Sequence, residues 1–151
     1  MRLTKLTDYA FRVLILAASS PGRNLTVDET ARLYGISAPH LKKVVTALTR
    51  TGFLVAVRGR SGGFRLALRP EQINLGEVIR AVEPDFALVE CFRKENECRI
   101  TCCCGLPPIL NEALDAMLSV LDRHTLADIA LAPGAVADLR NAAETADAAR
   151  T

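Results

Sequence analysis

The fold of this 151-residue chain is decided at residues 37–50, which read SAPHLKKVVTALTR. Four apolar residues of this stretch lie three or four positions apart, which predicts an amphipathic helix. They are Leu41, Val44, Val45 and Leu48. Ser37 is a favourable N-cap, and Pro39 falls in the first turn, where its missing N–H costs nothing. Gly52 follows at the expected C-terminal end.

A shorter helix over residues 27–34 is predicted directly before this stretch. Thr26 is placed to cap it, and Glu29 stands three residues later, as a capping box requires. Gly35 ends the helix and supplies the tight turn into the next one. Two short helices joined in this way form a helix-turn-helix, and a further helix is expected at residues 4–18.

A β-hairpin is predicted after the second helix. Residues 53–57 and 64–68 are β-prone, and the intervening stretch GRSGG at 59–63 is rich in turn formers. A helix-turn-helix followed by a basic hairpin is a winged helix. The expected fold class is therefore mainly α with a small β-hairpin wing, and residues 1–70 form the winged helix-turn-helix domain.

Three further segments follow this domain. Residues 71–108 are expected to form a short helix at 75–82, capped by Asn74, and a loop that holds all five cysteines. Residues 109–132 are expected to form a dimerisation helix, because a long apolar stripe on a small protein needs a partner, and the simplest partner is a second copy. The stripe consists of Ile109, Leu110, Leu114, Met117, Leu118, Leu121, Leu126 and Ile129. The Ala-rich tail at 133–151 is either a weak helix or a disordered extension.

The composition restricts the cellular setting. Half of the residues are apolar and 24% are charged, which is typical of a globular protein. No uncharged apolar run reaches the length of a membrane span, and no apolar signal-peptide core follows Met1. We therefore expect a cytoplasmic protein with no membrane association, in which cysteines serve as metal ligands or redox groups rather than in disulfides.

Charge is strongly segregated along the chain. No acidic residue occurs between Glu29 and Glu71, a stretch that contains eight Lys and Arg residues. Such an arrangement predicts a polyanion-binding surface, and the winged helix makes double-stranded DNA the expected partner. His40 is expected to donate to a base or a phosphate, or simply to be an exposed residue at the helix start. The predicted DNA contacts are Ser37, Pro39, His40, Lys42, Lys43, Arg58, Arg60, Ser61 and Arg65.

The cysteines do not follow the paired spacing of zinc modules. Cys91, Cys98 and Cys104 lie along a predicted loop, and Cys102 and Cys103 directly precede the last of them. Soft thiolates select zinc, copper(I) or an iron–sulfur cluster, so composition leaves a cluster, zinc and plain redox thiols open. An enzyme with a reactive cysteine is disfavoured, because no Cys/His/Asp constellation accompanies these thiols and the basic wing would have no role.

Several motifs resemble the Rrf2 family of winged-helix iron–sulfur regulators. They are MRLT at 1–4, DYA at 8–10, YGIS at 34–37, VRGRSGGFRL at 57–66 and INLGEVIR at 73–80. Within the family, ECF at 90–92, the later cysteines and HTLAD at 124–128 are most similar to the nitric-oxide-sensing repressors. The resemblance implies a homodimeric repressor, not an enzyme, that releases a palindromic operator when nitric oxide disrupts its cluster. An iron- or redox-responsive regulator of the same family is the alternative.

The resemblance also implies a set of metal ligands. It points to Cys91, Cys98 and a third cysteine, of which Cys104 fits the family spacing best, while Cys102 and Cys103 are substitutes or bystanders. In similar proteins a carboxylate from the first helix of the other subunit can supply the fourth ligand, and Asp8 matches that position. The alternative role for Asp8 is a carboxylate favoured by the helix dipole. The implied cofactor is a 4Fe–4S cluster, with 2Fe–2S as the alternative.

Overall fold

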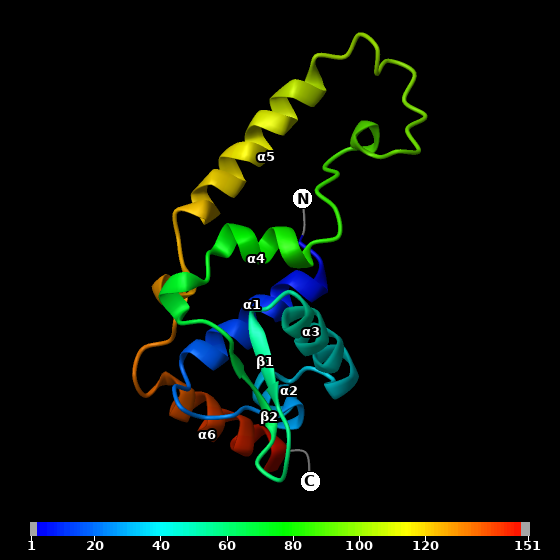
Figure 1. The fold of residues 1–151 in the computed structure, drawn as a ribbon. Coiled ribbons are helices and arrows are strands. Elements are labelled where there is room, and N and C mark those ends of the chain that lie inside the picture. The colour runs from blue at the N-terminus through cyan, green and yellow to red at the C-terminus, as the bar shows by residue number, and fades with distance from the viewer. Residues whose placement is uncertain (1–2, 149–151) are drawn as a thin grey trace.

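The computed structural model describes residues 3–148, and the winged helix lies at one end of it (Figure 1). Its winged-helix elements are α1 (Lys5–Ala18), α2 (Val27–Tyr34), α3 (Ala38–Arg50), β1 (Leu54–Val57) and β2 (Gly63–Leu66). They are followed by η1 (Pro70–Gln72), α4 (Leu75–Val82), η2 (Glu90–Phe92), α5 (Leu106–Asp122), η3 (Leu126–Ile129) and α6 (Ala135–Ala148). The mainly helical fold with one small hairpin is as predicted. No helix in the described part is long and apolar enough to cross a membrane.

One hydrophobic core holds the helix-turn-helix and the hairpin together. The inner faces of α1 and α3 pack on each other, and side chains from β1 and β2 close the core from the side. Fully buried members include Val13, Leu14, Leu16, Leu41, Val44, Leu48, Leu54 and Phe64. Three of the four predicted stripe residues of α3 are buried, and Val45 packs against the core at its edge. The helical periodicity therefore identified the inward face of α3 correctly.

The predicted caps are confirmed in position but not in every bond. Thr26 caps α2 by accepting a hydrogen bond from the Glu29 amide at 3.1 Å, but the reciprocal bond, from the Thr26 amide to the Glu29 carboxylate, is missing among the described contacts. Its carboxylate instead pairs with Arg23 at 2.8 Å. Ser37 is the N-cap of α3, yet its hydroxyl bonds to His40 rather than to a helix amide. In both cases a charged or aromatic neighbour competes successfully for the side chain.

The wing is anchored to the segment between α1 and α2. Strands β1 and β2 pair antiparallel, with Ala56 opposite Phe64. Phe64 also exchanges two backbone hydrogen bonds with Leu25, at 2.9 and 2.7 Å, which form an isolated antiparallel β-bridge beside the two-stranded sheet. Gly63 permits this approach, because a Cβ there would collide with the carbonyl oxygen of Leu25.

The predicted helix at 109–132 is wrong at both ends. Helix α5 starts at Leu106, with Pro107 and Pro108 in its first turn, and ends at Asp122. The chain then turns back, and Leu126 is fully buried in the core of the main body, where its amide donates to the carbonyl of Ile73 at 2.8 Å. Helical spacing continued across this break in the sequence, so two separate elements gave the pattern of one helix.

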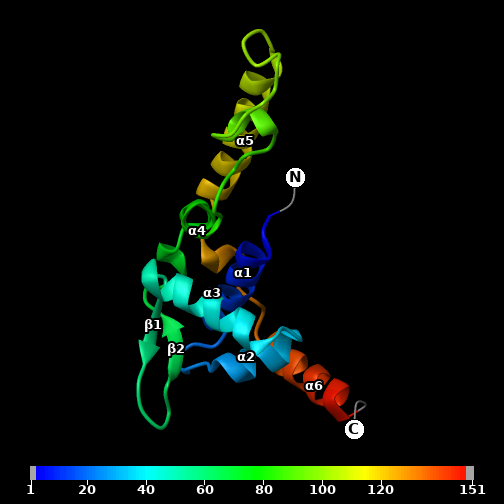
Figure 2. The same cartoon turned by 90° about the vertical axis from the view of Figure 1, so that its right-hand side faces the viewer.

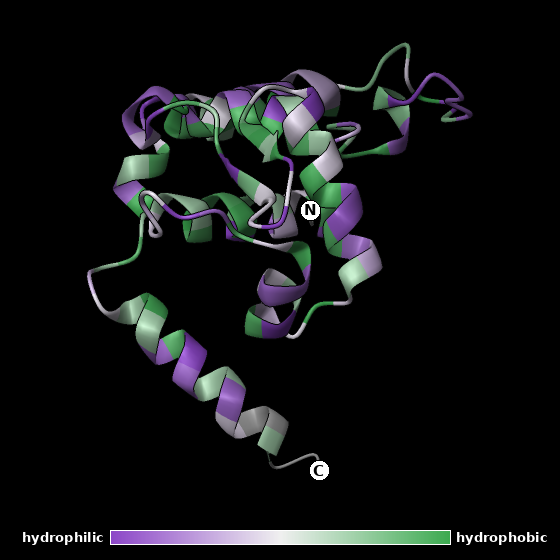
Figure 3. Cartoon of the chain, turned by 60° about the horizontal axis from the view of Figure 1, so that its bottom comes forward, coloured by the Kyte–Doolittle hydropathy of each residue, from purple (hydrophilic) through white to green (hydrophobic). Residues whose placement is uncertain are grey.

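The Ala-rich tail forms a helix in the described residues up to 148. Helix α6 packs against α2, and its Val136 contacts the core. Arg140 Nη2 lies 3.4 Å from the carboxylate of Glu29. Figure 3 shows apolar and polar residues alternating along α6, as expected for a helix with one packed face. The last three residues of the predicted tail, 149–151, lie outside the described part of the chain.

Candidate nucleic-acid interface and cysteine segment

The outer face of α3 carries the predicted contacts to DNA bases and phosphates. Pro39, His40, Lys42 and Lys43 are all exposed, while the opposite face of the helix is buried in the core. The Ser37 hydroxyl lies 2.8 Å from His40 Nδ1. Because this contact occupies Nδ1, Nε2 is the ring nitrogen of His40 that remains available to an external partner.

The wing presents the remaining predicted contacts. Arg58, Arg60, Ser61 and Arg65 are exposed, and Figure 2 shows the hairpin beside α3 with its tip pointing away from α5. Asn24 Nδ2 donates to the backbone carbonyl of Ser61 at 3.1 Å, which fixes the wing loop to the body. The sequence reasoning missed Asn24, because nothing in the local sequence indicates a partner 37 residues away.

The interface is electrostatically one-sided. The acid-free stretch between Glu29 and Glu71 contains all of α3 and the whole hairpin, so the lysines and arginines of both elements have no local acidic competitor. A face of this charge attracts phosphate backbone independently of sequence. A helix with exposed polar groups at its N-terminal end, beside a basic hairpin, has the geometry of a major-groove reader with a flanking wing.

Asp8 lies in the first turn of α1 and is already ion-paired. Arg12 Nε and Nη2 donate to its two carboxylate oxygens at 3.1 and 2.9 Å. Close by, the Tyr34 hydroxyl donates to the carbonyl of Arg12 at 2.9 Å, and burial raises the pKa of Tyr34 despite the opposing charge of Arg12. The spacing of four residues between Asp8 and Arg12 would have predicted their pairing.

The five cysteines lie in a segment with little regular structure, between Pro84 and α5. Cys91, Cys98 and Cys104 are half-buried, Cys102 and Cys103 are exposed, and all five thiols are free. Among residues 3–148, no three Cys, His, Asp or Glu side chains converge into a metal site. The structure of one subunit therefore does not bring Asp8 together with the cysteines.

The donor set nevertheless has the chemistry for an iron–sulfur cluster. Half-buried thiolates combine soft sulfur ligands with partial exclusion of water. Only the short η2 turn and a few local hydrogen bonds order this segment, such as that from the Cys98 amide to Asn96 Oδ1 at 2.9 Å. Few existing contacts would have to break for this segment to fold around a cofactor, so these residues fit such a group.

Helix α5 exposes apolar surface along its length. None of its residues is buried, and the exposed fraction reaches 63% at Ile109. At its C-terminal end, Arg80 of α4 forms two hydrogen bonds to Asp122, at 2.5 and 2.8 Å. These bonds lower the pKa of Asp122 and hold α5 on α4. In Figure 1 the rest of α5 projects away from the body, and its N-terminal end joins the cysteine segment.

These features together define a winged-helix DNA-binding protein. A family model described as "Rrf2: Iron-dependent Transcriptional regulator" matches residues 3–132, so the chain belongs to the Rrf2 family. It is accordingly a DNA-binding transcriptional regulator and not an enzyme. Helix α6 begins beyond the matched region.

Named relatives agree with this assignment. The chain is 50% identical over 131 residues to the HTH-type transcriptional regulator NsrR of Bacillus subtilis, covering 85% of this chain and 90% of that protein. It is 44% identical over 133 residues to the regulator of the same name from Shouchella clausii, covering 87% and 89%. The expected similarity to the NsrR group is thus confirmed.

Solved structures confirm the fold. The structure of CymR, described as the global cysteine regulator of B. subtilis, matches with a TM-score of 0.69 and 26% identity, covering 86% of this chain and 96% of that one. T. potens IscR matches with a TM-score of 0.67 and 24% identity, covering 85% of each chain. Both likenesses extend over the winged helix and continue beyond it.

Proposed function

We propose that this chain is a homodimeric repressor that releases a palindromic operator in response to nitric oxide, through an iron–sulfur cluster held by the cysteine segment. The observation that carries the proposal is the position of this segment: three half-buried thiols lie between α4 and α5 of a DNA-binding winged helix. Identity of 44–50% to regulators named NsrR supports nitric oxide as the effector.

The DNA-binding step is assigned to α3 and the wing. The helix start, with Ser37, Pro39 and His40, enters the major groove, while Lys42 and Lys43 hold phosphates, since a flexible ammonium positions without specifying. Arg58, Arg60, Ser61 and Arg65 contact the flanking groove and backbone. In the dimer, two copies of α3 must be separated by about one turn of DNA, roughly 34 Å.

The cofactor is assigned to Cys91, Cys98 and Cys104, with Asp8 of the other subunit as the fourth ligand. When bound, a 4Fe–4S cluster supplies iron that reacts with nitric oxide. A carboxylate holds iron less firmly than a thiolate does, so ligation by Asp8 keeps one position exchangeable. Cys102 and Cys103, which are the most exposed thiols, are left outside the ligand set.

The dimer contact is assigned to α5. A helix of 17 residues without a single buried side chain leaves apolar surface that a second copy covers. Burying a side chain such as Ile109 stabilises an interface by roughly 1.5–3 kcal/mol. The contact also places the cysteine segment of one subunit at the dimer interface, because this segment leads directly into α5.

The coupling step runs through α1. Asp8 stands on α1, and α1 packs on α3, so a change in ligation at Asp8 moves the helix that supports the recognition helix. A hundredfold loss of affinity requires only about 2.7 kcal/mol of differential binding, which a small shift in the separation of the two recognition helices can provide.

An iron-responsive regulator is the second candidate, and one observation favours it. The matching family is described as iron-dependent. Both candidates use the same cysteines and the same DNA face, and they differ in the event that releases DNA. In the iron-responsive case, loss of iron to a chelator is enough to release the operator, and nitric oxide is not needed.

The test uses full-length protein purified without oxygen and a DNA duplex selected by that protein from a random-sequence pool. We expect brown protein with iron–sulfur absorbance, dimeric binding to a palindromic duplex, and loss of binding after nitric oxide is added. Colourless protein with unimpaired binding would contradict the proposal. Release of DNA when an iron chelator is added, by protein that keeps its DNA when nitric oxide is added, would favour the second candidate.

A further inference from the structure

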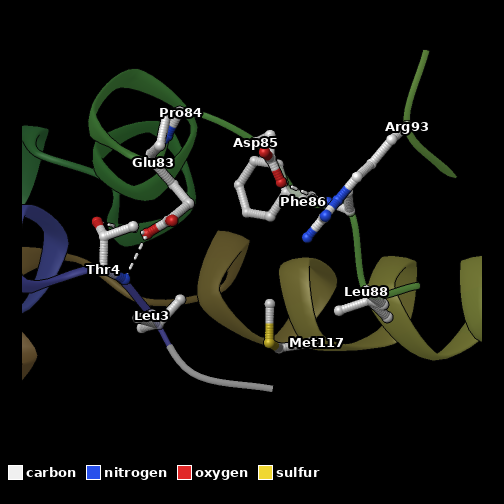
Figure 4. Close-up of a pocket in the computed structure, with 10 residues that line it drawn as sticks. Leu3, Thr4, Glu83, Pro84, Asp85, Phe86, Leu88, Arg93 and Met117 are labelled. Carbon is white, nitrogen blue, oxygen red and sulfur yellow. Dashed lines mark hydrogen bonds between the residues drawn. The ribbon is translucent and has the colours of Figure 1, made fainter. Parts of the chain in front are cut away.

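Glu83 joins the start of α1 to the end of α4. Its carboxylate accepts hydrogen bonds from the Thr4 amide and the Thr4 hydroxyl, both at 3.2 Å, and from the hydroxyl of Thr7. Figure 4 shows Glu83 directed at Thr4 from the opposite side of the contact. The residues that meet here are 76–79 positions apart in sequence, so this is a tertiary contact between two elements.

The contact is well placed to be strong. Thr7 is fully buried and Glu83 is half-buried, so water competes weakly for the carboxylate. Hydrogen bonds to an ionised acceptor are about twice as strong as neutral ones. The carboxylate also faces the N-terminal end of α1, where the helix dipole favours negative charge. Thr4 simultaneously caps α1 by accepting from the Thr7 amide at 3.3 Å.

Both ends of this contact lie next to parts of the chain that are proposed to hold the cluster. On α1, Thr7 directly precedes Asp8, the proposed ligand to the cluster of the other subunit. On the other side, Glu83 is the C-cap of α4, and Pro84 begins the segment that carries the cysteines. The Glu83 carboxylate therefore connects the first turn of α1, which packs on α3, to the start of the cysteine segment.

Helices α1 and α4 share the hydrophobic core, but the start of α1 and the residues that follow Glu83 are loosely packed. A cavity of about 240 Å³ lies beside the Glu83 contact, lined among others by Leu3, Phe86 and Met117 (Figure 4). This open space separates the start of α1 from residues 84–88 and from Met117 of α5, so close packing does not join these parts directly. The hydrogen bonds to Glu83 span this region.

We infer that Glu83 is a positioning residue that transmits the state of the cysteine segment to α1 and so to the recognition helix. The inference rests on the proposed function, because it requires a cofactor-dependent change in the segment. When the segment is held by its ligands, Glu83 holds the first turn of α1 in the DNA-binding arrangement. When ligation is lost, the same contact pulls α1 with the segment, and α3 shifts.

The test compares Glu83→Gln with Glu77→Gln, a matched change on the exposed side of the same helix. Each loaded dimer is bound to the selected duplex, and its affinity is measured before and after nitric oxide. In the wild type we expect nitric oxide to lower the DNA affinity about a hundredfold, which corresponds to about 2.7 kcal/mol. In Glu83→Gln we expect nitric oxide to lower the DNA affinity less than about tenfold, with cluster absorbance before nitric oxide unchanged. Glu77→Gln should respond like the wild type.

A second pair of variants guards against a simple folding defect. Thr7→Ser keeps the hydroxyl donor, and Thr7→Val removes it at nearly constant volume. Only Thr7→Val should therefore reduce the loss of DNA affinity that nitric oxide causes. Amide hydrogen exchange in residues 5–18 gives a readout apart from DNA binding. We expect nitric oxide to change the protection of α1 in the wild type and Thr7→Ser, but not in Glu83→Gln.

The outcomes separate this inference from the proposed function. If the wild type keeps its DNA affinity and its α1 protection after nitric oxide, the proposed function fails and this inference fails with it. If the wild type responds and Glu83→Gln and Thr7→Val respond equally, the proposed function stands and the role of Glu83 is overturned. If Glu77→Gln weakens the response of DNA affinity to nitric oxide as much as Glu83→Gln does, the role of Glu83 is also overturned.

Discussion

Asp8 and Arg12 form a two-point salt bridge on one face of α1, with N–O distances of 3.1 and 2.9 Å. The side chains are 47% and 44% exposed, and exposed pairs spaced by four helix residues contribute only about 0.3–0.5 kcal/mol. Arg12 therefore holds the Asp8 carboxylate in a defined position at the surface, and the pair is weak enough to permit the proposed ligation of the other subunit's cluster by Asp8.

This geometry gives a prediction for variants at both positions. Asp8→Ala should still load a cluster on three thiolates, because these supply most of the affinity, but the absorbance should change and DNA binding should become insensitive to nitric oxide. Asp8→Cys should bind the cofactor more firmly and respond more slowly, since the exchangeable position is closed. Absorbance and DNA binding are followed during a nitric oxide titration.

Arg12→Ala is the matched control for the Asp8 variants, because it breaks the salt bridge and keeps the carboxylate. It should retain the wild-type response. If Arg12→Ala loses the response as Asp8→Ala does, the salt bridge itself and not metal ligation is the functional feature. If Asp8→Ala keeps both the wild-type spectrum and dose dependence, Asp8 is only a helix-terminal carboxylate.

The cysteines should separate into two groups. Cys91→Ala, Cys98→Ala and Cys104→Ala should each abolish stable loading, because every lost thiolate leaves one iron undercoordinated. Cys102→Ala and Cys103→Ala, which change the exposed thiols of the same segment, should load normally. Iron and sulfide content per subunit are measured after anaerobic reconstitution. A colourless Cys103→Ala beside a brown Cys104→Ala would reverse the assignment of the third ligand.

Binding to DNA should depend steeply on salt. If a dimer neutralises about six to eight phosphates, log K should fall with log salt at a slope of about −5 to −7. Arg60→Ala should weaken binding and reduce this slope by about two, one phosphate for each subunit, with cluster absorbance unchanged. Arg123→Ala removes a positive charge at the C-terminal end of α5, outside the proposed DNA interface, and should keep the wild-type slope. A flat salt response, or full affinity in Arg60→Ala, would count against the wing.

The dimer should depend on the exposed apolar face of α5. Ile109→Asp places a charge at the most exposed apolar position of the helix and should produce monomers, because a charge without a partner is costly to bury in an interface. Glu112→Gln on the same helix should remain dimeric. Sedimentation at micromolar protein concentration distinguishes the two species. An unaltered dimer in Ile109→Asp would place the subunit contact elsewhere.

Local sequence rules predicted the winged helix well. The helices ended close to their predicted caps and glycines, because capping and left-handed turns are decided within a few residues. Gly35, for example, adopts φ +61° at the end of α2. The buried face of α3 followed from its periodicity, because each side chain at that spacing meets the same neighbouring elements.

Long-range contacts could not be predicted in the same way. Leu126 carries helical spacing from α5, yet it is buried against the main body, and only the capping box of Thr125 and Asp128 marks locally that a new element begins there. The hydrogen bonds of Glu83 with Thr4 and Thr7, and of Asn24 with Ser61, depend on which distant elements meet in the folded chain. The same holds for Arg140, whose partner Glu29 is 111 positions away.

The most direct test of the proposed sensor is a single anaerobic titration of the cluster-loaded wild-type dimer bound to its selected duplex. Iron–sulfur absorbance and fluorescence anisotropy of labelled DNA are recorded on the same sample as nitric oxide is added. We expect the absorbance to bleach and the anisotropy to fall over the same range of nitric oxide per cluster, with an affinity loss of about a hundredfold. Bleaching with the DNA still fully bound would contradict the account.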